Sequence, residues 1–219
     1  MRRSRALIAI LMLAIVPSSH AYDNGDFQIW NTQGQEWEIG KGTTLTQEEE
    51  WKYGDVASEL FSQHYEWGVI WGFDNRLDLG ITYRQVYEKD GDDWLSENRP
   101  YATATLKHDL WKFKFVGRNR IEYRHFDYDR EDFIRYRHRS MLKLPIDFKG
   151  IKITPHISNE IFIVSNGDGF SQDRAYIGLE FDPERHFNFD IYYMAQYLKR
   201  SEDKWSYVNV LGFKLRVSF

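Results

Sequence analysis

Two neighbouring stretches in the middle of the chain place basic side chains at alternate positions. In a β-strand, alternate side chains point to the same face, so each stretch presents one basic face. Rings of basic groups select anions, so these faces predict binding or passage of a small anionic ligand. The basic positions are Arg118, Arg120 and Arg124 on the first stretch, and Arg135, Arg137, Arg139 and Lys143 on the second.

Carboxylates occupy the same polar face, both within the basic stretches and in other parts of the chain. They are Glu48, Glu50, Glu66, Asp78, Glu122, Glu160, Glu180 and Asp190. Buried charges need partners, so the acidic and basic groups together also fit a charge network with a structural role only. The sequence leaves both interpretations open.

A second constellation consists of His156 and Ser158, which lie two residues apart on one predicted strand and precede Asn159. A hydroxyl becomes a useful nucleophile when such a base lies beside it. The arrangement resembles that of outer-membrane phospholipases, but the glycine that follows Ser-Asn in those enzymes is Glu160 here. The pair also shares the polar face and not the apolar one. We therefore predict no enzymatic activity, with a lipid hydrolase using His156 and Ser158 as the alternative.

Other cofactor and metal patterns are missing from the sequence. Cysteine is absent, and no Walker or dinucleotide glycine pattern occurs. Residues 166–169 with Asp173 lack the further carboxylates of an EF-hand and suit an ordinary turn. The net charge of −4 indicates no nucleic-acid partner. Histidines without ligand spacing are His64, His108, His125, His138 and His186. We expect neither a metal nor a cofactor.

Alternating polarity recurs along the chain and predicts strands with two different faces. The stretches are 27–39, 43–53, 61–73, 77–88, 100–108, 112–126, 133–144, 151–165, 174–182, 187–199 and 205–219. Tight breaks alternate with more acidic and often longer ones such as 89–99, as in outer-membrane barrels with short periplasmic turns and longer external loops. Bacterial single-chain barrels have even strand numbers, so either residues 27–39 hide a turn near residues 31–34 or a strand elsewhere is wrongly assigned. We expect about 12 strands, or else ten.

The apolar face of these strands is predicted to meet lipid. The stretches reach the 9–11 residues of a transmembrane strand, aromatic residues gather near their ends, and Phe219 ends the last strand like an assembly signal. The fold predicted is therefore an all-β, antiparallel transmembrane barrel. Its partners would be membrane lipid and the outer-membrane assembly machinery. A soluble periplasmic, lipocalin-like binding barrel is the alternative.

The first two strands fit this scheme least well. Their nominal lipid faces carry polar residues, for which we expect a register shift or bulge as the explanation. These residues are Asn31, Gln33 and Gln35 on the first strand, and Gln47 and Glu49 on the second.

The beginning of the chain has the pattern of an export signal. Arg2, Arg3 and Arg5 precede an apolar run that is too short to span a bilayer, and small residues follow at Ser19 and Ala21. We expect residues 1–21 to be a Sec-type signal peptide and residues 22–219 to form the barrel domain. The expected location is the outer membrane of a Gram-negative bacterium.

Four segments also resemble the DUF2490 family of uncharacterised bacterial outer-membrane proteins. They are residues 117–124, with the sequence GRNRIEYR; residues 134–139, IRYRHR; residues 153–155, ITP; and residues 190–193, DIYY. The resemblance implies an outer-membrane barrel and assigns no activity.

Overall fold

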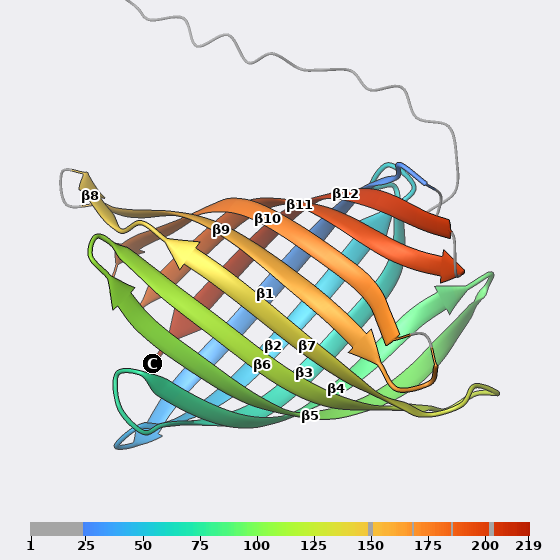
Figure 1. Ribbon diagram of the computed structural model, residues 1–219, viewed down its shortest axis with the longest axis horizontal. Helices are drawn as coiled ribbons and strands as arrows, with labels where there is room; N and C mark the ends of the chain where they lie inside the picture. Colours follow the sequence, from blue (N-terminus) through green and yellow to red (C-terminus); the bar gives the residue numbers. More distant parts are fainter. Residues whose placement is uncertain (1–23, 149–150, 168, 185, 202–203) are drawn as a thin grey trace, which may run out of the picture.

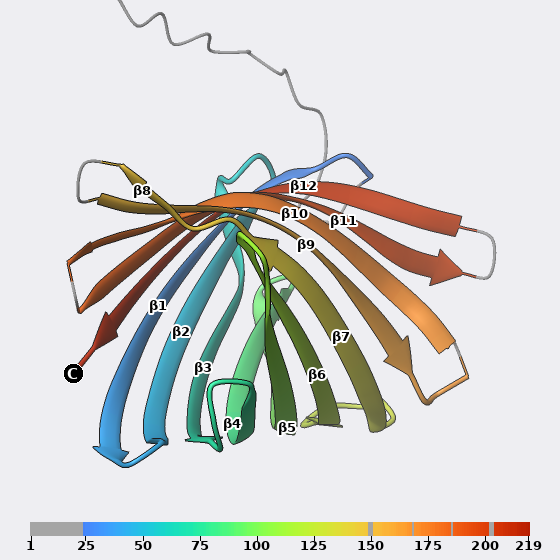
Figure 2. The same cartoon turned by 60° about the vertical axis from the view of Figure 1, so that its left-hand side comes forward.

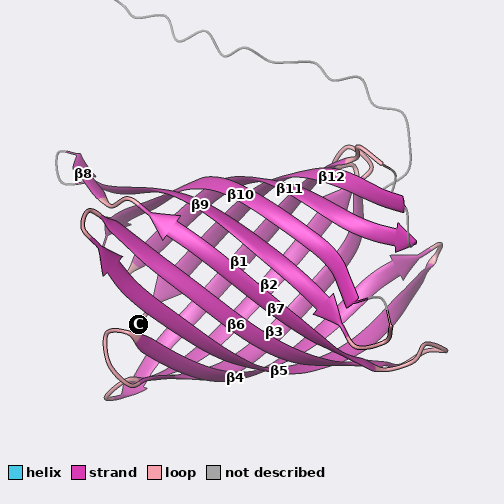
Figure 3. Cartoon of the chain, viewed as in Figure 1, coloured by secondary structure: helices cyan, strands magenta, loops and turns pink. Residues whose placement is uncertain are grey.

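The computed structural model describes residues 24–148, 151–167, 169–184, 186–201 and 204–219. The predicted signal peptide, residues 1–21, lies outside the described residues. The described residues form strands and turns (Figure 3), and no helix among them is long and apolar enough to cross a membrane. The strands are β1 (Phe27–Gly40), β2 (Thr43–Gly54), β3 (Glu59–Gly72), β4 (Leu77–Asp90), β5 (Asp93–Leu110), β6 (Phe113–Phe126), β7 (Phe133–Lys143), β8 (Ile146–Phe148), β9 (Ile151–Val164), β10 (Gly169–Glu184), β11 (Phe187–Ser201) and β12 (Lys204–Ser218).

The strands close into a barrel (Figure 1), which confirms the predicted all-β barrel fold. Within the described residues, eleven strands form the closed wall, and each of the eleven predicted stretches corresponds to one of them. The twelfth strand, β8, has three residues and pairs with β9. Figures 1 and 2 place β8 at the end of the barrel where the chain terminates. The hidden turn expected near residues 31–34 is wrong, because β1 runs through them without a break.

A wall with an odd number of strands can close because its first and last strands run in the same direction. β1 pairs with β12 in parallel, from Phe27 opposite Asn209 to Glu36 opposite Ser218. Every other neighbouring pair in the described wall is antiparallel. The start of β1 and the end of β12 therefore lie at opposite ends of the barrel.

Phe219 continues from β12 along this parallel seam. Its backbone N–H donates to the carbonyl of Glu36 at 2.9 Å. Its ring stacks on Trp37, with ring centroids 5.8 Å apart and an interplanar angle of 10°. Phe219 thus fastens the last strand to the first, whereas its predicted role as an assembly signal stays a prediction.

The connection expected at residues 89–99 is shorter than predicted. β4 and β5 stay paired as far as Asp90 opposite Asp93, so the turn consists of Gly91 and Asp92. Gly91 adopts a positive φ of 63°, a conformation that suits glycine in a tight hairpin. The acidic residues that we predicted to form a loop therefore belong to strands. Strand pairing satisfies the backbone hydrogen bonds of this segment whether its side chains are acidic or not.

The two faces of the wall differ in polarity. Polar and charged side chains point into the lumen, where Glu122 and Glu160 are buried. Apolar side chains point outward, as with Ile81 at 62% exposed and Ile177 at 60%. Exposed aromatic residues lie on the outer face near both barrel ends: Trp71, Phe73, Trp111 and Phe187 at one, and Tyr123, Trp205 and Tyr207 at the other.

A small apolar core also fills part of the lumen. It lies inside β1, β10, β11 and β12 and consists of Trp30, Tyr176, Met194, Val208 and Val210. Charged side chains from the remaining strands, together with Arg174, Asp190 and Lys214, line the rest of the interior. This core restricts the lumen on one side of the barrel.

The polar residues of the first hairpin lie on the outer face without any local irregularity. β1 and β2 pair in continuous register from Ile29 opposite Tyr53 to Glu38 opposite Thr44. The register shifts of these strands fall at their ends, beyond Glu38 in β1 and beside Lys52 in β2. The bulge expected to turn Gln33 and its neighbours inward is therefore wrong.

Candidate functional site

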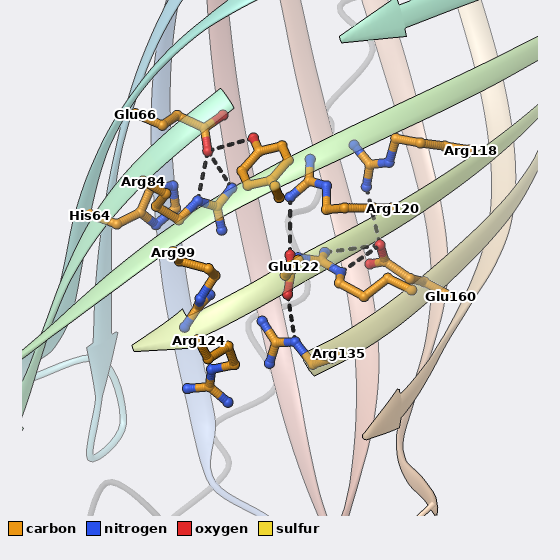
Figure 4. Close-up of polar contacts among 12 residues, drawn as sticks. His64, Glu66, Arg84, Arg99, Arg118, Arg120, Glu122, Arg124, Arg135 and Glu160 are labelled. Atoms are coloured by element: carbon orange, nitrogen blue, oxygen red, sulfur yellow. Dashed lines mark hydrogen bonds and ion pairs between the residues drawn. The ribbon is translucent and has the colours of Figure 1, made fainter. Parts of the chain in front are cut away.

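The predicted basic ladder forms inside the barrel, on the facing strands β6 and β7. Their antiparallel register places Arg118 opposite Arg139 and Arg120 opposite Arg137. Directly opposed side chains on one face of a sheet are close neighbours, and like charges there repel. The ladder therefore needs carboxylates, and Figure 4 shows two of them, Glu122 and Glu160, among the guanidinium groups.

Glu122 is the first of these carboxylates and is completely buried. Its Oε2 accepts a hydrogen bond from Arg135 Nε at 2.6 Å, and its Oε1 accepts one from Arg137 Nη1 at 2.9 Å. Arg120 Nη1 approaches the same Oε1 at 3.5 Å. One carboxylate thus serves three arginines.

Glu160, on β9, is the second and is almost as buried. Arg137 Nη2 and Arg118 Nη2 donate to its Oε1 at 2.9 and 3.1 Å. The Tyr176 hydroxyl donates to Oε2 at 3.1 Å, and Arg174 Nη1 lies 3.8 Å from the same atom. Glu160 is therefore also shared by three arginines, one of which, Arg137, bridges both carboxylates.

Arg139 and Arg120 are the least neutralised members of the ladder. Arg139 forms no ion pair with a described carboxylate; its Nε donates to Ser158 Oγ at 3.1 Å. Arg120 Nε is buried and has no hydrogen-bond partner in the described part of the chain. Six guanidinium groups, those of Arg118, Arg120, Arg135, Arg137, Arg139 and Arg174, therefore surround two carboxylates.

Aromatic rings hold several of these guanidinium planes. Arg137 and Arg174 lie over Phe162, at 4.7 and 4.8 Å from the ring centroid. Arg120 lies 3.9 Å from the ring of Tyr101, and Arg139 lies 4.3 Å from that of Tyr176. Stacking uses the face of the guanidinium and leaves its N–H edges for other acceptors. The ladder is thus preorganised with donors to spare.

The ladder opens onto a lumenal cavity of about 430 Å³. Among the described residues, its lining contains five carboxylates: Glu48, Glu50, Glu88, Glu160 and Asp190. The same lining contains thirteen basic residues: Lys52, Arg84, Arg99, Arg118, Arg120, Arg124, Arg130, Arg135, Arg137, Arg139, Arg174, Arg200 and Lys214. Even with Glu66, Glu97 and Glu122 added from behind the lining, cations outnumber carboxylates.

The barrel strands match the profile of one protein family over most of the chain. The profile of a family described as a protein of unknown function, DUF2490, matches residues 27–207. The chain belongs to the DUF2490 family. The match spans every strand that carries the ladder, so the predicted resemblance is confirmed. No curated protein matches this chain significantly.

Two predicted members of the site take other places in this DUF2490 barrel. Arg124 forms a separate pair with Glu97, through Nε at 2.7 Å and Nη2 at 2.6 Å, and Arg99 binds the same carboxylate at 2.7 and 2.8 Å. Lys143 binds Glu180 at 2.7 and 2.8 Å and does not line the cavity. The sequence missed Glu97 because its segment was predicted to be a loop.

His156 and Ser158 both face the lumen and are buried, but each has another partner. His156 Nε2 lies 2.9 Å from Asp190 Oδ1, and Ser158 Oγ accepts from Arg139. No hydrogen bond joins His156 to Ser158 in the described structure. The arrangement lacks the bond between base and nucleophile on which serine catalysis depends.

A group that sequence spacing did not indicate lies on β2 and β3. One ligand atom from each of Glu48, His64 and Glu66 falls within 4.8 Å of the others, an arrangement that could hold a metal ion. Glu48 already pairs with Lys214, and Glu66 Oε2 pairs with Arg84 Nη2 at 2.5 Å. A divalent cation would have to displace these cations inside a cavity that is already positive, so the charges disfavour it.

Proposed function

We propose that this chain is an exported outer-membrane β-barrel that binds a small oxyanion in its lumen, without catalysing a reaction on it. The excess of guanidinium groups over carboxylates around the cavity is the observation that carries the proposal. Arg120 and Arg139 supply the donors that have the fewest partners.

The membrane location is supported by the polarity of the two faces. A lipocalin-like soluble barrel would bury its apolar side chains and expose its polar ones, whereas this wall does the reverse. Most strands of the wall have at least 14 residues, more than the 9–11 that cross a bilayer at a tilt. Exposed aromatic residues near both barrel ends suit the two interfaces.

The choice of an anion over a purely structural network is supported by charge. A network that only fills the lumen would balance its charges, because an unpaired buried charge is costly. Here two carboxylates pair with five arginines, and Arg139 beside them has no carboxylate partner among the described residues, so an anion that enters the cavity completes the pairing. Arginine forks bind phosphate-like and carboxylate groups in a bidentate manner.

The same geometry favours binding, or slow passage, over an open pore. A barrel of eleven strands is narrow beside the 16–18 strands of porins, and the Trp30 core fills one side of the lumen. The cavity volume of about 430 Å³ suits a small molecule.

The binding proposal is tested by titrating the full refolded barrel in detergent with inorganic phosphate and with citrate, followed by calorimetry. We expect saturable binding that an Arg120→Gln/Arg139→Gln double variant weakens at least tenfold, since hydrogen bonds to charged groups contribute about 1.5–3 kcal/mol each. Lys107→Gln removes one positive charge outside the cavity, where Lys107 pairs with Asp78, and is the matched control. Absence of binding, or equal weakening by both variants, would contradict the proposal.

Two further measurements test the rest of the proposal. Cell fractionation with a heat-modifiability gel is expected to place the folded barrel in the outer membrane; recovery in the soluble periplasm contradicts that location. Incubation with phospholipid is expected to release no fatty acid. Hydrolysis by the unaltered chain that Ser158→Ala abolishes would establish the hydrolase alternative instead.

A further inference from the structure

The middle of the first hairpin carries polar side chains on the outer face of the barrel. Asn31, Gln33 and Gln35 alternate along the central part of β1, and Gln47 and Glu49 do so on β2. The strand register sets Gln33 opposite Glu49 and Gln35 opposite Gln47, so the five side chains form one continuous patch. We call these five residues the outer polar stripe.

Apolar side chains flank the stripe at the same height on both sides. On β12, Phe213 and Leu215 lie opposite Asn31 and Gln33. On β3, Trp67 lies opposite Gln47. The stripe is therefore not the polar end of the barrel wall but an interruption halfway along it.

Most hydrogen-bonding groups of the stripe have no side-chain partner within the described part of the chain. Its one side-chain hydrogen bond within the described structure runs from Gln47 Nε2 to Glu49 Oε1 at 3.3 Å. Gln33 and Gln35 are exposed. If the barrel lies in a membrane, as proposed above, these groups meet hydrocarbon at mid-depth, where unsatisfied polar groups are costly.

We infer that the outer polar stripe is the docking surface for a second copy of this chain in the membrane. Each amide both donates and accepts hydrogen bonds, so a row of amides is complementary to itself across a two-fold axis. Glu49 adds an acceptor that a glutamine amide of the other copy satisfies. Lipid tails offer no such partners, whereas side-chain amides join membrane segments in this way.

The test uses the absence of cysteine from the natural sequence. A Gln35→Cys variant of the full chain, expressed in cells and treated with a short bifunctional maleimide in isolated outer membranes, is expected to give a cross-linked product of twice the chain mass. Ile177→Cys is the matched control, because Ile177 is equally outward-facing at mid-strand on β10. It is expected to give at least fivefold less of that product.

A second variant removes the polar groups without opposing the fold. Gln33→Leu with Gln35→Leu presents lipid with apolar side chains, so the barrel should stay folded and heat-modifiable while its dimer fraction falls at least fivefold. A product of another mass identifies a different protein partner and overturns the second-copy inference. A monomeric, heat-modifiable barrel in the outer membrane overturns it while the proposed location stands. Recovery in the soluble fraction removes the basis of both.

Discussion

The buried carboxylates and cations are paired differently on two sides of the lumen. On the side formed by β2, β3, β4 and β12, three carboxylates pair one to one with a cation: Glu48 with Lys214, Glu66 with Arg84, and Glu50 with Lys52. On the side formed by β6, β7, β9 and β10, Glu122 and Glu160 are shared among five arginines, and Arg139 beside them has no carboxylate partner among the described residues. We refer to these as the balanced wall and the arginine wall.

The difference shows that a narrow barrel does not by itself require a surplus of arginine. The balanced wall lines the same cavity and reaches near neutrality with ordinary pairs. The arginine wall keeps more donors than its carboxylates satisfy, and places them on aromatic rings that fix their orientation. The surplus therefore belongs to one side of the site, the side to which we assign the proposed anion.

Removal of one carboxylate from each wall is expected to give the largest difference in stability between them. Glu122→Gln leaves three buried arginines without their shared negative charge, and we expect a loss of about 3–5 kcal/mol in the free energy of unfolding. Glu48→Gln affects one cation, Lys214, which is partly solvated, so the loss should be about 1 kcal/mol.

Urea unfolding in detergent micelles, followed by the heat-modifiable gel shift, measures both losses. Added phosphate should restore stability to the Glu122→Gln barrel more than to the Glu48→Gln barrel, because the anion replaces the missing acceptor. Equal losses from the two variants would show that the walls do not differ.

A smaller effect is expected where a predicted member of the ladder lies outside the cavity. Lys143→Gln removes a cation that binds Glu180 near the end of β7. We expect the affinity for phosphate to stay within about twofold of the natural value, since the charge is distant and partly screened. Calorimetric titration beside the Arg120→Gln/Arg139→Gln variant checks this. A tenfold loss would extend the site to that end.

The smallest expected effect concerns the turns that join the strands of each wall. Asp132, in the β6–β7 connection, accepts hydrogen bonds from the Tyr123 hydroxyl at 2.6 Å and the Phe126 amide at 3.0 Å. Together with the His125 ring, these bonds lower the pKa of Asp132 to about 2. Because the folded pKa lies below that of the unfolded chain, the stabilisation is complete above about pH 4 and is lost as pH falls through about 2.

Hydrogen exchange of the Phe126 amide measures this contribution. Asp132→Asn should speed that exchange several-fold at neutral pH and leave the unfolding midpoint unchanged. Asp74→Asn is the counterpart on the balanced wall, where Asp74 accepts from the amides of Arg76 and Leu77 at 2.6 and 3.0 Å. An Asp132→Asn barrel with unaltered Phe126 exchange would contradict the assignment.

The sequence was sufficient to predict the eleven strands of the wall, apart from the first part of β5, and to assign their residues to two faces. Alternation alone put Arg120 and Ile121 on opposite sides, because the side-chain period of a strand is two. It could not show that Glu97 belongs to a strand, because its acidic surroundings resemble a loop. Nor could it show how many arginines share Glu160, since that depends on the register between β7 and β9 and on the approach of β6 and β10.

The odd number of strands in the wall also could not be predicted from the sequence. The even number expected from known bacterial barrels follows from placing both ends of the chain on one side of the membrane. Here β1 and β12 pair in parallel, and β8 supplies a twelfth strand outside the closed wall. Such a pairing joins the two ends of the chain, so no local pattern in either strand reveals it.

We expect the parallel pairing of β1 with β12 to be the least stable strand pairing of the barrel. Parallel ladders are slightly less stable per residue than antiparallel ones, and this ladder joins strands with no covalent turn between them. The stacked rings of Trp37 and Phe219 stabilise this pairing at one end. A second copy bound to the outer polar stripe on β1 and β2 would stabilise the wall next to the pairing of β1 with β12.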